Sequence, residues 1–336
     1  MEPRLRFKGL AFGLALGFLA ACQVAPNAEL ERLSHLPLEG QPWYFADHQG
    51  RMIKTEHYTI YTTVENNLYQ HLLVRVLEST HQRMTAMVGR GGADDSELSQ
   101  PMTCYVFGSR GQWETYTRAR AGSNAPIYLQ IASGGYSQEG VFAGYDIGQD
   151  PTLSVVAHEA WHQYSWYAFK DRLPAWLEEG MATQNEAFEW KGAELVFRPE
   201  KNYRRLESLR QAMRGGESRG SMWHLPDLLS THAGQVIRQP QTKIDAYYAE
   251  LWSFVQFLEQ SPMYGPKLRT LLANARAGML VASLDGSGVT PREIENFSEH
   301  WNAVAGPVYL QKYIEPDLDA LEREYLQWVR AYLREH

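Results

Sequence analysis

Cysteine is nearly absent from this sequence, with only Cys22 and Cys104 among 336 residues. Cys22 directly follows an apolar N-terminal run, so the rest of the chain has a single thiol and cannot form an intramolecular disulfide. Cys104 lies in the apolar stretch 103–107, which favours a buried strand position over a nucleophile. Stability must therefore come from packing, and an apolar content of 44% is enough for a sizeable core.

Positive charge and long apolar runs are also scarce. The chain has 32 Lys and Arg residues against 39 Asp and Glu residues, a net charge of -7. Because nucleic-acid binding needs a basic surface, we expect no nucleic-acid partner. The longest apolar run, Gly9 to Ala21, is shorter than the about 20 residues that a membrane-spanning helix needs. We find no internal repeat and no low-complexity segment longer than a loop.

The N-terminus has the pattern of a secretory signal. A positively charged head (Arg4, Arg6 and Lys8) precedes the apolar run, which ends in the small residues Ala20 and Ala21. This order of charge, apolar run and small residues is typical of an export signal that is removed from the mature protein. We therefore expect residues 1–21 to be a signal peptide.

The junction Leu19-Ala20-Ala21-Cys22 resembles the lipobox of bacterial lipoproteins. The resemblance implies cleavage before Cys22 and acylation of that cysteine, which would anchor the protein to a membrane of the cell envelope. Gln23 follows instead of Asp, which implies the periplasmic face of the outer membrane if the host is Gram-negative. The alternative is an ordinary signal peptide followed by a chance cysteine.

Hydrophobic periodicity divides the remaining chain into a tether (22–50), a small α/β lobe (51–150) and a mainly helical lobe (151–336). The fold class is thus predicted to be α+β. Strands are expected at 57–62, 102–107, 128–131 and 141–145, with Gly134-Gly135 as a turn, and helices at 66–88 and 112–120. In the second lobe we expect helices at 150–169, from Pro174, and at 203–213, 244–260, 266–276 and 318–333, with a hairpin near 188–197.

The string His158-Glu159-Ala160-Trp161-His162 carries the chemistry of the sequence. Residues four apart lie on one face of a helix, so both imidazoles can bind one ion at about 2.0–2.1 Å. Glu159 lies about 100° further round the helix. It can therefore act as general base on a water at the open side of a zinc ion.

Chance alone would produce this motif roughly 0.03 times per chain of this composition. The residues around it strengthen its interpretation as a metal site. The expected helix has Asp150 as its N-cap and Pro151 at its first position. An apolar run, 153–157, precedes the motif, and carboxylates follow in Trp176-Leu177-Glu178-Glu179-Gly180. The spacing alone leaves the third ligand open between Glu178 and Glu179.

The string from Pro174 to Ala182 resembles the gluzincin metallopeptidases, which include thermolysin-like enzymes and a group of aminopeptidases. In that family the glutamate directly before glycine binds zinc, which implies Glu179 as the third ligand and Glu178 as a solvated rim residue. The resemblance also implies a gluzincin-like fold in which the helix of the motif lies between the two lobes. The substrate-amine string of the aminopeptidases is absent, and His224 and His232 are candidates for a thermolysin-type histidine only by position.

The resemblance is strongest to poorly characterised bacterial proteins similar to this peptidase superfamily, and it covers most of the mature chain. It implies that a tyrosine in Tyr247-Tyr248 donates a hydrogen bond to the developing oxyanion, with Tyr248 in the matching register. It also implies an edge strand that pairs with substrate, with Gly134, Gly135 and Tyr136 lining the cleft. The alternatives are a core aromatic residue for Tyr248 and a plain turn for the other three residues.

The sequence thus predicts a membrane-anchored zinc metallopeptidase that binds one Zn²⁺ ion and hydrolyses peptide or protein substrates. A zinc-bound water would attack the carbonyl after Glu159 takes its proton. Two alternatives remain: a zinc-dependent envelope amidase that acts on a non-protein substrate, and a catalytically idle lipoprotein that only binds. Intact Glu159 argues against the second, because an idle site needs no base.

Overall fold

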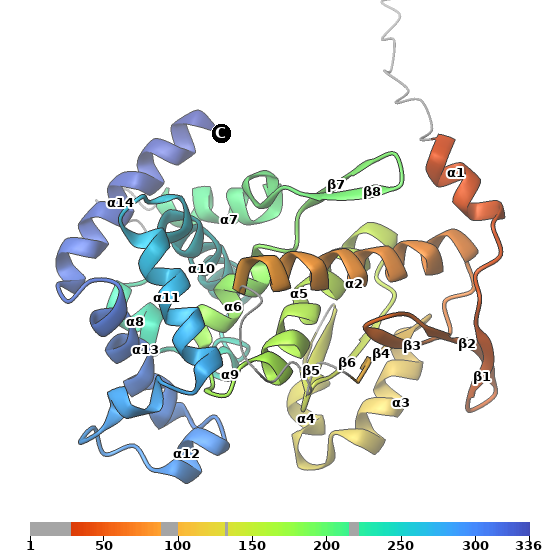
Figure 1. Cartoon of the computed structure of the whole chain (residues 1–336), viewed down its shortest axis with the longest axis horizontal. Helices are drawn as coiled ribbons and strands as arrows, with labels where there is room; N and C mark the ends of the chain where they lie inside the picture. The colour runs from red at the N-terminus through yellow and green to blue at the C-terminus, as the bar shows by residue number, and fades with distance from the viewer. Residues whose placement is uncertain (1–27, 89–99, 132–133, 215–221) are drawn as a thin grey trace, which may run out of the picture.

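The computed structural model describes residues 28–88, 100–131, 134–214 and 222–336 (Figure 1). The expected signal peptide and Cys22 lie outside these ranges, as does the first part of the expected tether. Within them, no helix is both long enough and apolar enough to cross a membrane.

A six-stranded mixed sheet forms one half of the molecule. Its strands lie in the order β1-β2-β3-β4-β6-β5, which makes β5 one of the two edge strands. β3 and β4 alternate between buried and half-buried side chains, as expected of strands covered on both faces to different degrees. The bounds are β1 Gln41–Phe45, β2 His48–Lys54, β3 Tyr58–Thr62, β4 Met102–Phe107, β5 Gly135–Gln138 and β6 Val141–Tyr145.

Helices cover the two faces of the sheet. β3, β4 and β6 run parallel to one another, so each connection between them must cross over a face. α2 (Asn67–Val88) makes the first crossover and packs against α5 (Gln149–Ala168), the two lying on one face. α3 (Arg110–Arg120) and α4 (Ala125–Tyr128) cover the opposite face at β4, β6 and β5 (Figure 1).

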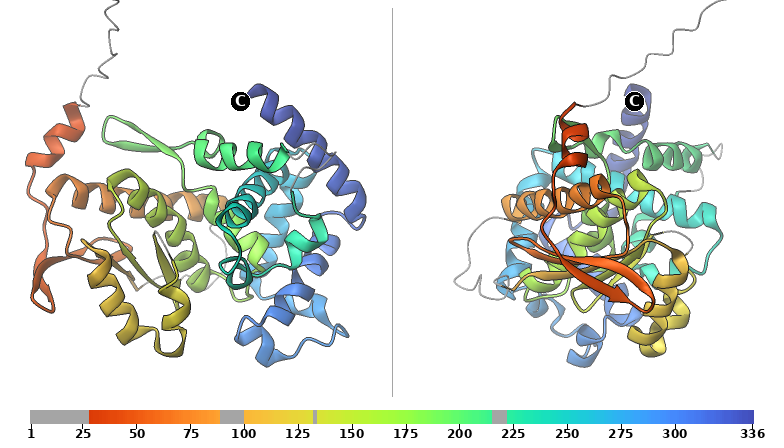
Figure 2. Two further views of the ribbon diagram at one scale, coloured as in Figure 1. Left: turned by 180° about the vertical axis from the view of Figure 1, so that it is seen from behind. Right: turned by 90° about the vertical axis from the view of Figure 1, so that its right-hand side faces the viewer.

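The other half of the molecule is helical, and Figure 2 shows it on the side opposite the sheet. Its central element is α10 (Gln241–Gln260), which contacts α6, α7, α11 and α14 and is buried along most of its length. The other elements are α6 Ala175–Thr183, β7 Phe188–Lys191, β8 Glu194–Phe197, α7 Tyr203–Met213, α8 Leu225–Ser230, α9 Ala233–Val236, α11 Tyr264–Ala277, α12 Pro291–Glu295, α13 Glu299–Tyr313 and α14 Leu318–Glu335.

The predicted α+β class is confirmed, and so are most of the predicted helices and strands. The expected boundary at residue 150 is not a break in the core. One buried cluster includes Ile60 of the sheet, Val156 of α5 and Leu251 of α10. The two halves therefore share one hydrophobic core, with α5 at its centre.

The prediction of a tether is wrong for residues 28–50. They form α1 (Ala28–His35), β1 and the start of β2. The polar, Pro-containing composition was misleading because Pro42 lies in edge strand β1, which pairs only with β2 and can accommodate a residue without an N–H. Asn67 of α2 donates to the carbonyl oxygens of Ser34 and Leu36, which fixes the end of α1.

The predicted strand at 128–131 is also wrong. Tyr128 ends α4, and the guanidinium of Arg110 donates to the carbonyl oxygens of Leu129 and Ile131. The carbonyls of this segment are thus bonded to a side chain instead of a neighbouring strand. An apolar run of this length cannot show which of the two partners it will find.

Two smaller predictions about chain reversals and helix starts are corrected as well. Gly135 begins strand β5, and the turn into β6 lies at Glu139 and Gly140, which have φ of 52° and 73°. α5 begins at Gln149 after Gly148, so Asp150 lies in the first turn and is not the N-cap. The N-terminus of a helix has a partial positive charge, so an acidic residue is favourable both at the N-cap and in the first turn. The presence of Asp150 alone therefore could not show at which residue α5 begins.

Close packing of α6 against α10 generates the first prediction. A Cβ on Gly180 would lie 2.5 Å from Cγ2 of Val255, so Gly180→Ala must push the two helices apart. We expect a loss of about 1–3 kcal/mol in the free energy of unfolding, measured by urea denaturation of the metal-free protein. The control is Gly111→Ala in α3, where a Cβ meets nothing within 4 Å. This control should be neutral or slightly stabilising; equal losses in both variants would contradict the packing argument.

Candidate metal centre

α5 supplies the two histidines of the motif. The helix is enclosed by α2, the sheet and α6, and its residues Val156, Ala157, Ala160 and Trp161 are fully buried. His158 and His162 point to the same side of the helix, with their ring centroids 5.1 Å apart. The apolar surroundings hold α5 rigidly, so the two imidazoles have a fixed separation.

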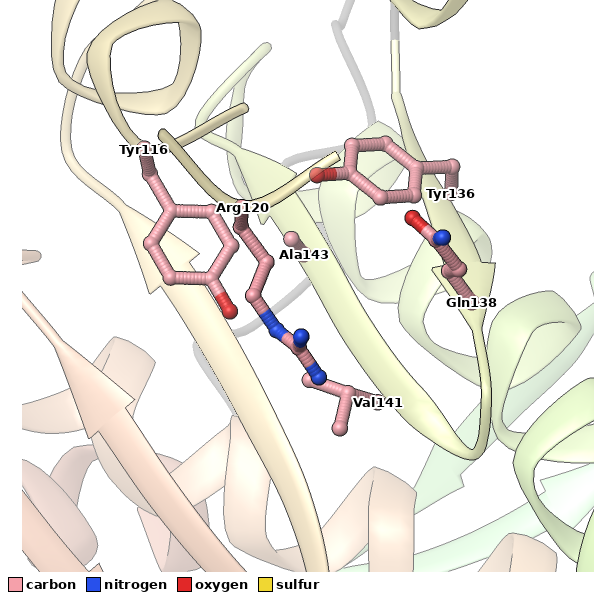
Figure 3. Close-up of a pocket in the computed structure, with 6 residues that line it drawn as sticks. All are labelled: Tyr116, Arg120, Tyr136, Gln138, Val141 and Ala143. Atoms are coloured by element: carbon pink, nitrogen blue, oxygen red, sulfur yellow. The ribbon is translucent and has the colours of Figure 1, made fainter. Parts of the chain in front are cut away.

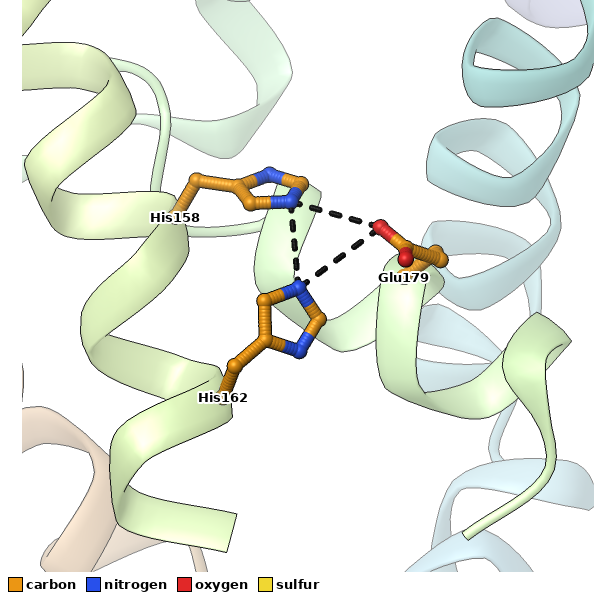
Figure 4. Close-up of side chains that lie close together, drawn as sticks. All are labelled: His158, His162 and Glu179. Atoms are coloured by element: carbon orange, nitrogen blue, oxygen red, sulfur yellow. Dashed lines mark hydrogen bonds and ion pairs between the residues drawn. The ribbon is translucent and has the colours of Figure 1, made fainter. Parts of the chain in front are cut away.

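α6 brings Glu179 to the same point, as Figure 4 shows. The Nε2 atoms of His158 and His162 lie 3.3 Å apart. Oε2 of Glu179 lies 3.3 Å from Nε2 of His158 and 3.7 Å from Nε2 of His162. Tetrahedral zinc with bonds of about 2.0–2.1 Å requires ligand atoms about 3.3–3.4 Å apart. The triangle therefore fits a zinc ion, and the predicted set His158, His162 and Glu179 is brought together by the fold.

A carboxylate also binds the outer nitrogen of each imidazole. Nδ1 of His158 lies 2.9 Å from Oε1 of Glu186, and Nδ1 of His162 lies 3.4 Å from Oε2 of Glu178. A carboxylate at Nδ1 places the proton there and leaves the Nε2 lone pair for a metal. Both imidazoles thus present the correct nitrogen to the centre of the triangle.

The expectation that Glu178 is a solvated rim residue is wrong. Its Oε2 accepts from Nε1 of Trp161 at 2.8 Å and from the hydroxyl of Ser165 at 3.1 Å.

Glu186 was not predicted from the sequence, because it follows α6 in a stretch without a motif. Its only sequence signal is its position in the chain, seven residues beyond Glu179, which indicates nothing until the fold is known.

The charges of the cluster call for a cation. Glu178, Glu179 and Glu186 contribute three negative charges, and Arg205, which pairs with Glu186, contributes one positive charge. With neutral imidazoles the net charge is therefore -2, and the carboxylate of Glu159 makes it -3. Buried charge of one sign is costly unless it is compensated, and a divalent ion at the triangle supplies the compensation.

The carboxylates also change the proton affinity of the imidazoles. Burial opposes a charged ring, but the hydrogen bonds with Glu179 and Glu186 outweigh it and raise the pKa of His158 to about 9. Burial acts in the same way on His162, and the charge of Glu179 and the bond to Glu178 raise its pKa well above the usual value. Burial would raise the pKa of Glu179, yet the two imidazoles hold it far below its usual range. Without a metal, protons on the imidazoles therefore balance the carboxylates.

Glu159 lies beside the triangle and does not join it. It is 8% exposed, and its Oε2 has no hydrogen-bond partner among the described residues. Its negative charge is one of the causes that raise the pKa of His162. A buried carboxylate oxygen without a donor is available to accept a proton from a small molecule in the site.

Tyr248 of α10, and not Tyr247, lies next to the metal ligands. Its ring centroid is 6.4 Å from that of His158, whereas the hydroxyl of Tyr247 donates to the carbonyl oxygen of Thr231 at 3.1 Å. Burial, and then the charge of Glu179, raise the pKa of Tyr248 well above its usual value, so the phenol stays neutral and can donate. The two tyrosines are adjacent in sequence, and only the helix rotation separates their roles.

The three residues predicted to line the cleft divide between the two faces of the sheet. Gly134, with φ of 115°, lies against Val155 of α5, and Gly135 begins edge strand β5. Tyr136 points to the opposite face, where it stacks on Tyr128 with ring centroids 4.0 Å apart and is 5% exposed. Side chains alternate along a strand, so Tyr136 and Ser137 cannot both face α5; the hydroxyl of Ser137 does, donating to the carbonyl oxygen of Glu159.

A depression on the face away from α5 is therefore separate from the metal centre (Figure 3). It is lined by Tyr116 and Arg120 of α3 together with Tyr136, Gln138, Val141 and Ala143 of the two edge-most strands. These side chains point away from His158 and His162 because they lie on the face that α3 covers. Tyr136 belongs to this depression.

The two histidines that were candidates by position differ in their surroundings. His224 is largely exposed and lies 3.4 Å from a carboxylate oxygen of Glu322. His232 is the N-cap of α9, and its Nδ1 accepts from the backbone N–H of Gly234. Burial lowers the pKa of His232, and the charge of Glu179 opposes this shift. Of the two, His232 is thus the one that the charge of the metal centre reaches.

No protein-family model matches the chain, and a comparison with curated proteins finds no match either. The function of the chain must therefore be inferred from the geometry of the candidate metal centre.

Proton release on metal binding is the first prediction from this geometry. Because both imidazoles have raised pKa values without a metal, zinc binding at pH 7 should release at least one proton per ion. Two unperturbed imidazoles with a pKa of about 6.5 would release only about half a proton. Calorimetric titration in buffers of different ionisation enthalpy measures the number. Zinc affinity should accordingly fall as the pH is lowered, and proton-independent binding would contradict the site.

The second prediction concerns the outer carboxylate. Glu186→Ala should weaken zinc affinity by about 10–100-fold, since His158 then loses the partner that fixes its ring. Competition with a chromogenic chelator measures the dissociation constant. Glu189→Ala, which removes a more exposed carboxylate from the adjacent strand β7, is the matched control and should leave the affinity unchanged. Equal affinities for the two variants would contradict a role of Glu186 at the metal.

Proposed function

We propose that this protein is a zinc-dependent hydrolase that cleaves peptide bonds at the cell envelope, to which Cys22 anchors it. The observation that carries the proposal is the buried Oε2 of Glu159, which has no donor among the described residues and belongs to the residue that follows His158 on α5, between the two histidines of the triangle. A binding site that only needs to hold a metal has no use for such a carboxylate, whereas hydrolysis requires a base at this place.

His158, His162 and Glu179 would hold the zinc ion, whose Lewis acidity polarises a carbonyl group and lowers the pKa of water. Glu159 takes the proton of the attacking water on a carboxylate oxygen and later passes it to the leaving amine. The hydroxyl of Tyr248 would donate a hydrogen bond to the carbonyl oxygen as negative charge grows there. Glu178 and Glu186 keep the two rings in their orientation, and the apolar core around α5 limits the access of bulk water.

Edge strand β5 supports a peptide as substrate. The carbonyl oxygen of Gly134 accepts from the N–H of Tyr145, and the hydrogen-bonded pairs alternate along β5 and β6. The backbone groups of Gly135 and Ser137 therefore point to the open edge. An extended peptide added there would run past Glu159, whose carbonyl oxygen already accepts from Ser137. Gly134 and Gly135 remain proposed contacts through their backbone; the side chain of Tyr136 does not.

The test is Glu159→Gln. The variant should keep one zinc ion per chain and lose hydrolysis by about 10²–10⁴-fold, because the amide cannot accept the proton. Zinc content by atomic absorption and cleavage of a mixed peptide library provide the two measurements. The control is Glu56→Gln, which alters a highly exposed carboxylate. Full activity in Glu159→Gln would exclude Glu159 as the base.

The choice of substrate separates the proposal from its alternatives. Chelator-sensitive cleavage of casein or of the peptide library by the wild-type protein supports a peptidase. Release of fragments from purified peptidoglycan, with casein intact, would indicate an envelope amidase instead. Zinc binding without hydrolysis of either material would indicate a lipoprotein that uses the metal only for binding.

A further inference from the structure

Arg205 is a buried cation next to the metal centre that no sequence motif indicated. It lies in the first turn of α7 and is 8% exposed. Burying a guanidinium is costly unless its donors are paired. Its partners therefore indicate why the position holds arginine.

The edge of the guanidinium holds Glu186. Nε donates to Oε2 at 2.8 Å and Nη2 donates to Oε1 at 2.6 Å, a bidentate pair. Nδ2 of Asn202 donates to Oε2 at 2.8 Å, and Nδ1 of His158 lies 2.9 Å from Oε1. Each oxygen of Glu186 thus has two partners, so the carboxylate cannot rotate away from His158.

The same guanidinium lies over the ring of Tyr248. Its Cζ is 5.1 Å from the centroid of the phenol ring, and that ring is in turn 6.4 Å from the ring of His158. A cation over an aromatic face is attractive, more so when both groups are removed from water. Arg205, Glu186, His158 and Tyr248 therefore form a closed ring of contacts around one side of the metal centre.

A guanidinium can make both contacts because it is planar. Its edge presents a fork of donors, and its face remains free for stacking. A lysine ammonium at the same position would keep the charge but could not bind a carboxylate with a fork while stacking on a ring. A residue that served only to neutralise Glu186 would not need the second contact.

We propose that Arg205 is the positioning residue that couples the metal ligand His158 to Tyr248, fixing the first through Glu186 and the second through the contact of its guanidinium with the phenol ring. The part that concerns Tyr248 rests on the proposed hydrolytic function. The part that concerns His158 depends only on metal binding. The two parts therefore have separate tests.

Metal affinity tests the first contact. Arg205→Lys and Arg205→Met should each weaken zinc binding by about 10–100-fold, as measured by chelator competition. Glu186→Gln, which leaves Arg205 in place, should do the same and supplies the answer if an arginine variant does not fold. Arg198→Lys is the control, because that arginine pairs with Glu189 and Glu200 on the surface. Lower thermal stability with unchanged zinc affinity in the variants would show a merely structural role and overturn the proposal.

A double-mutant cycle tests the second contact. With zinc saturating, Arg205→Lys should lower kcat/KM by about 10-fold in the wild-type background, as expected for a modest misplacement of a catalytic group. In the Tyr248→Phe background the same change should have a clearly smaller effect, because the hydroxyl that Arg205 positions is gone. Equal effects in the two backgrounds would overturn the coupling.

The metal itself offers a readout that needs no activity. The visible spectrum of the cobalt(II)-substituted protein reports the geometry of the ligands, so Arg205→Lys should change it and Arg198→Lys should not. If no substrate is cleaved at all, the proposed function fails, while chelator competition and this spectrum still decide the contact between Arg205 and His158. An unchanged spectrum together with unchanged affinity would overturn that contact.

Discussion

The structure of this protein is organised around negative charge that is buried beside two imidazoles. Glu178, Glu179 and Glu186 lie within 3.7 Å of ring nitrogens of His158 and His162, and Arg205 pairs with Glu186. Such a group is stable only when each carboxylate has donors and the remaining charge is balanced by protons or by a cation. The elements that supply these residues must therefore meet at one point, as α5, α6 and the first turn of α7 do.

Helix packing brings these charged side chains together in the protein interior, where little water screens them. α5 crosses the sheet with Val156, Ala157, Ala160 and Trp161 fully buried, and Gly180 lets α6 approach α10 more closely than any larger residue would. α10 then carries Tyr248 to the same place. Because a continuous core holds the helices, the three candidate ligand atoms lie at separations that suit a zinc ion. The preorganised site is thus a product of the hydrophobic core.

Two kinds of residue in the site differ in how far the sequence could reveal them. His158, Glu159 and His162 were predictable because a helix places residues four apart on one face. Their spacing in the sequence therefore determines that both imidazoles point to the same side of the helix. Glu179 needed the register of a family resemblance, since its neighbour Glu178 has the same chemistry. Glu186 and Arg205 had no signal at all, because they reach the site from a loop and from α7: Glu186 contacts His158 of α5, and Arg205 contacts Glu186. Contacts between elements leave no local pattern in a sequence.

Local patterns determined most of the secondary structure, the α+β class and the two histidines of the candidate metal centre, because each depends on neighbours a few residues apart. Only the tertiary structure decided that residues 28–50 belong to the fold, since Pro42 is tolerated at a sheet edge and the sequence does not say which strand is an edge. It also decided that Tyr248 and not Tyr247 faces His158, and that Tyr136 turns away from α5. A strand or helix has faces before folding, but what each face meets depends on the packing of the whole chain.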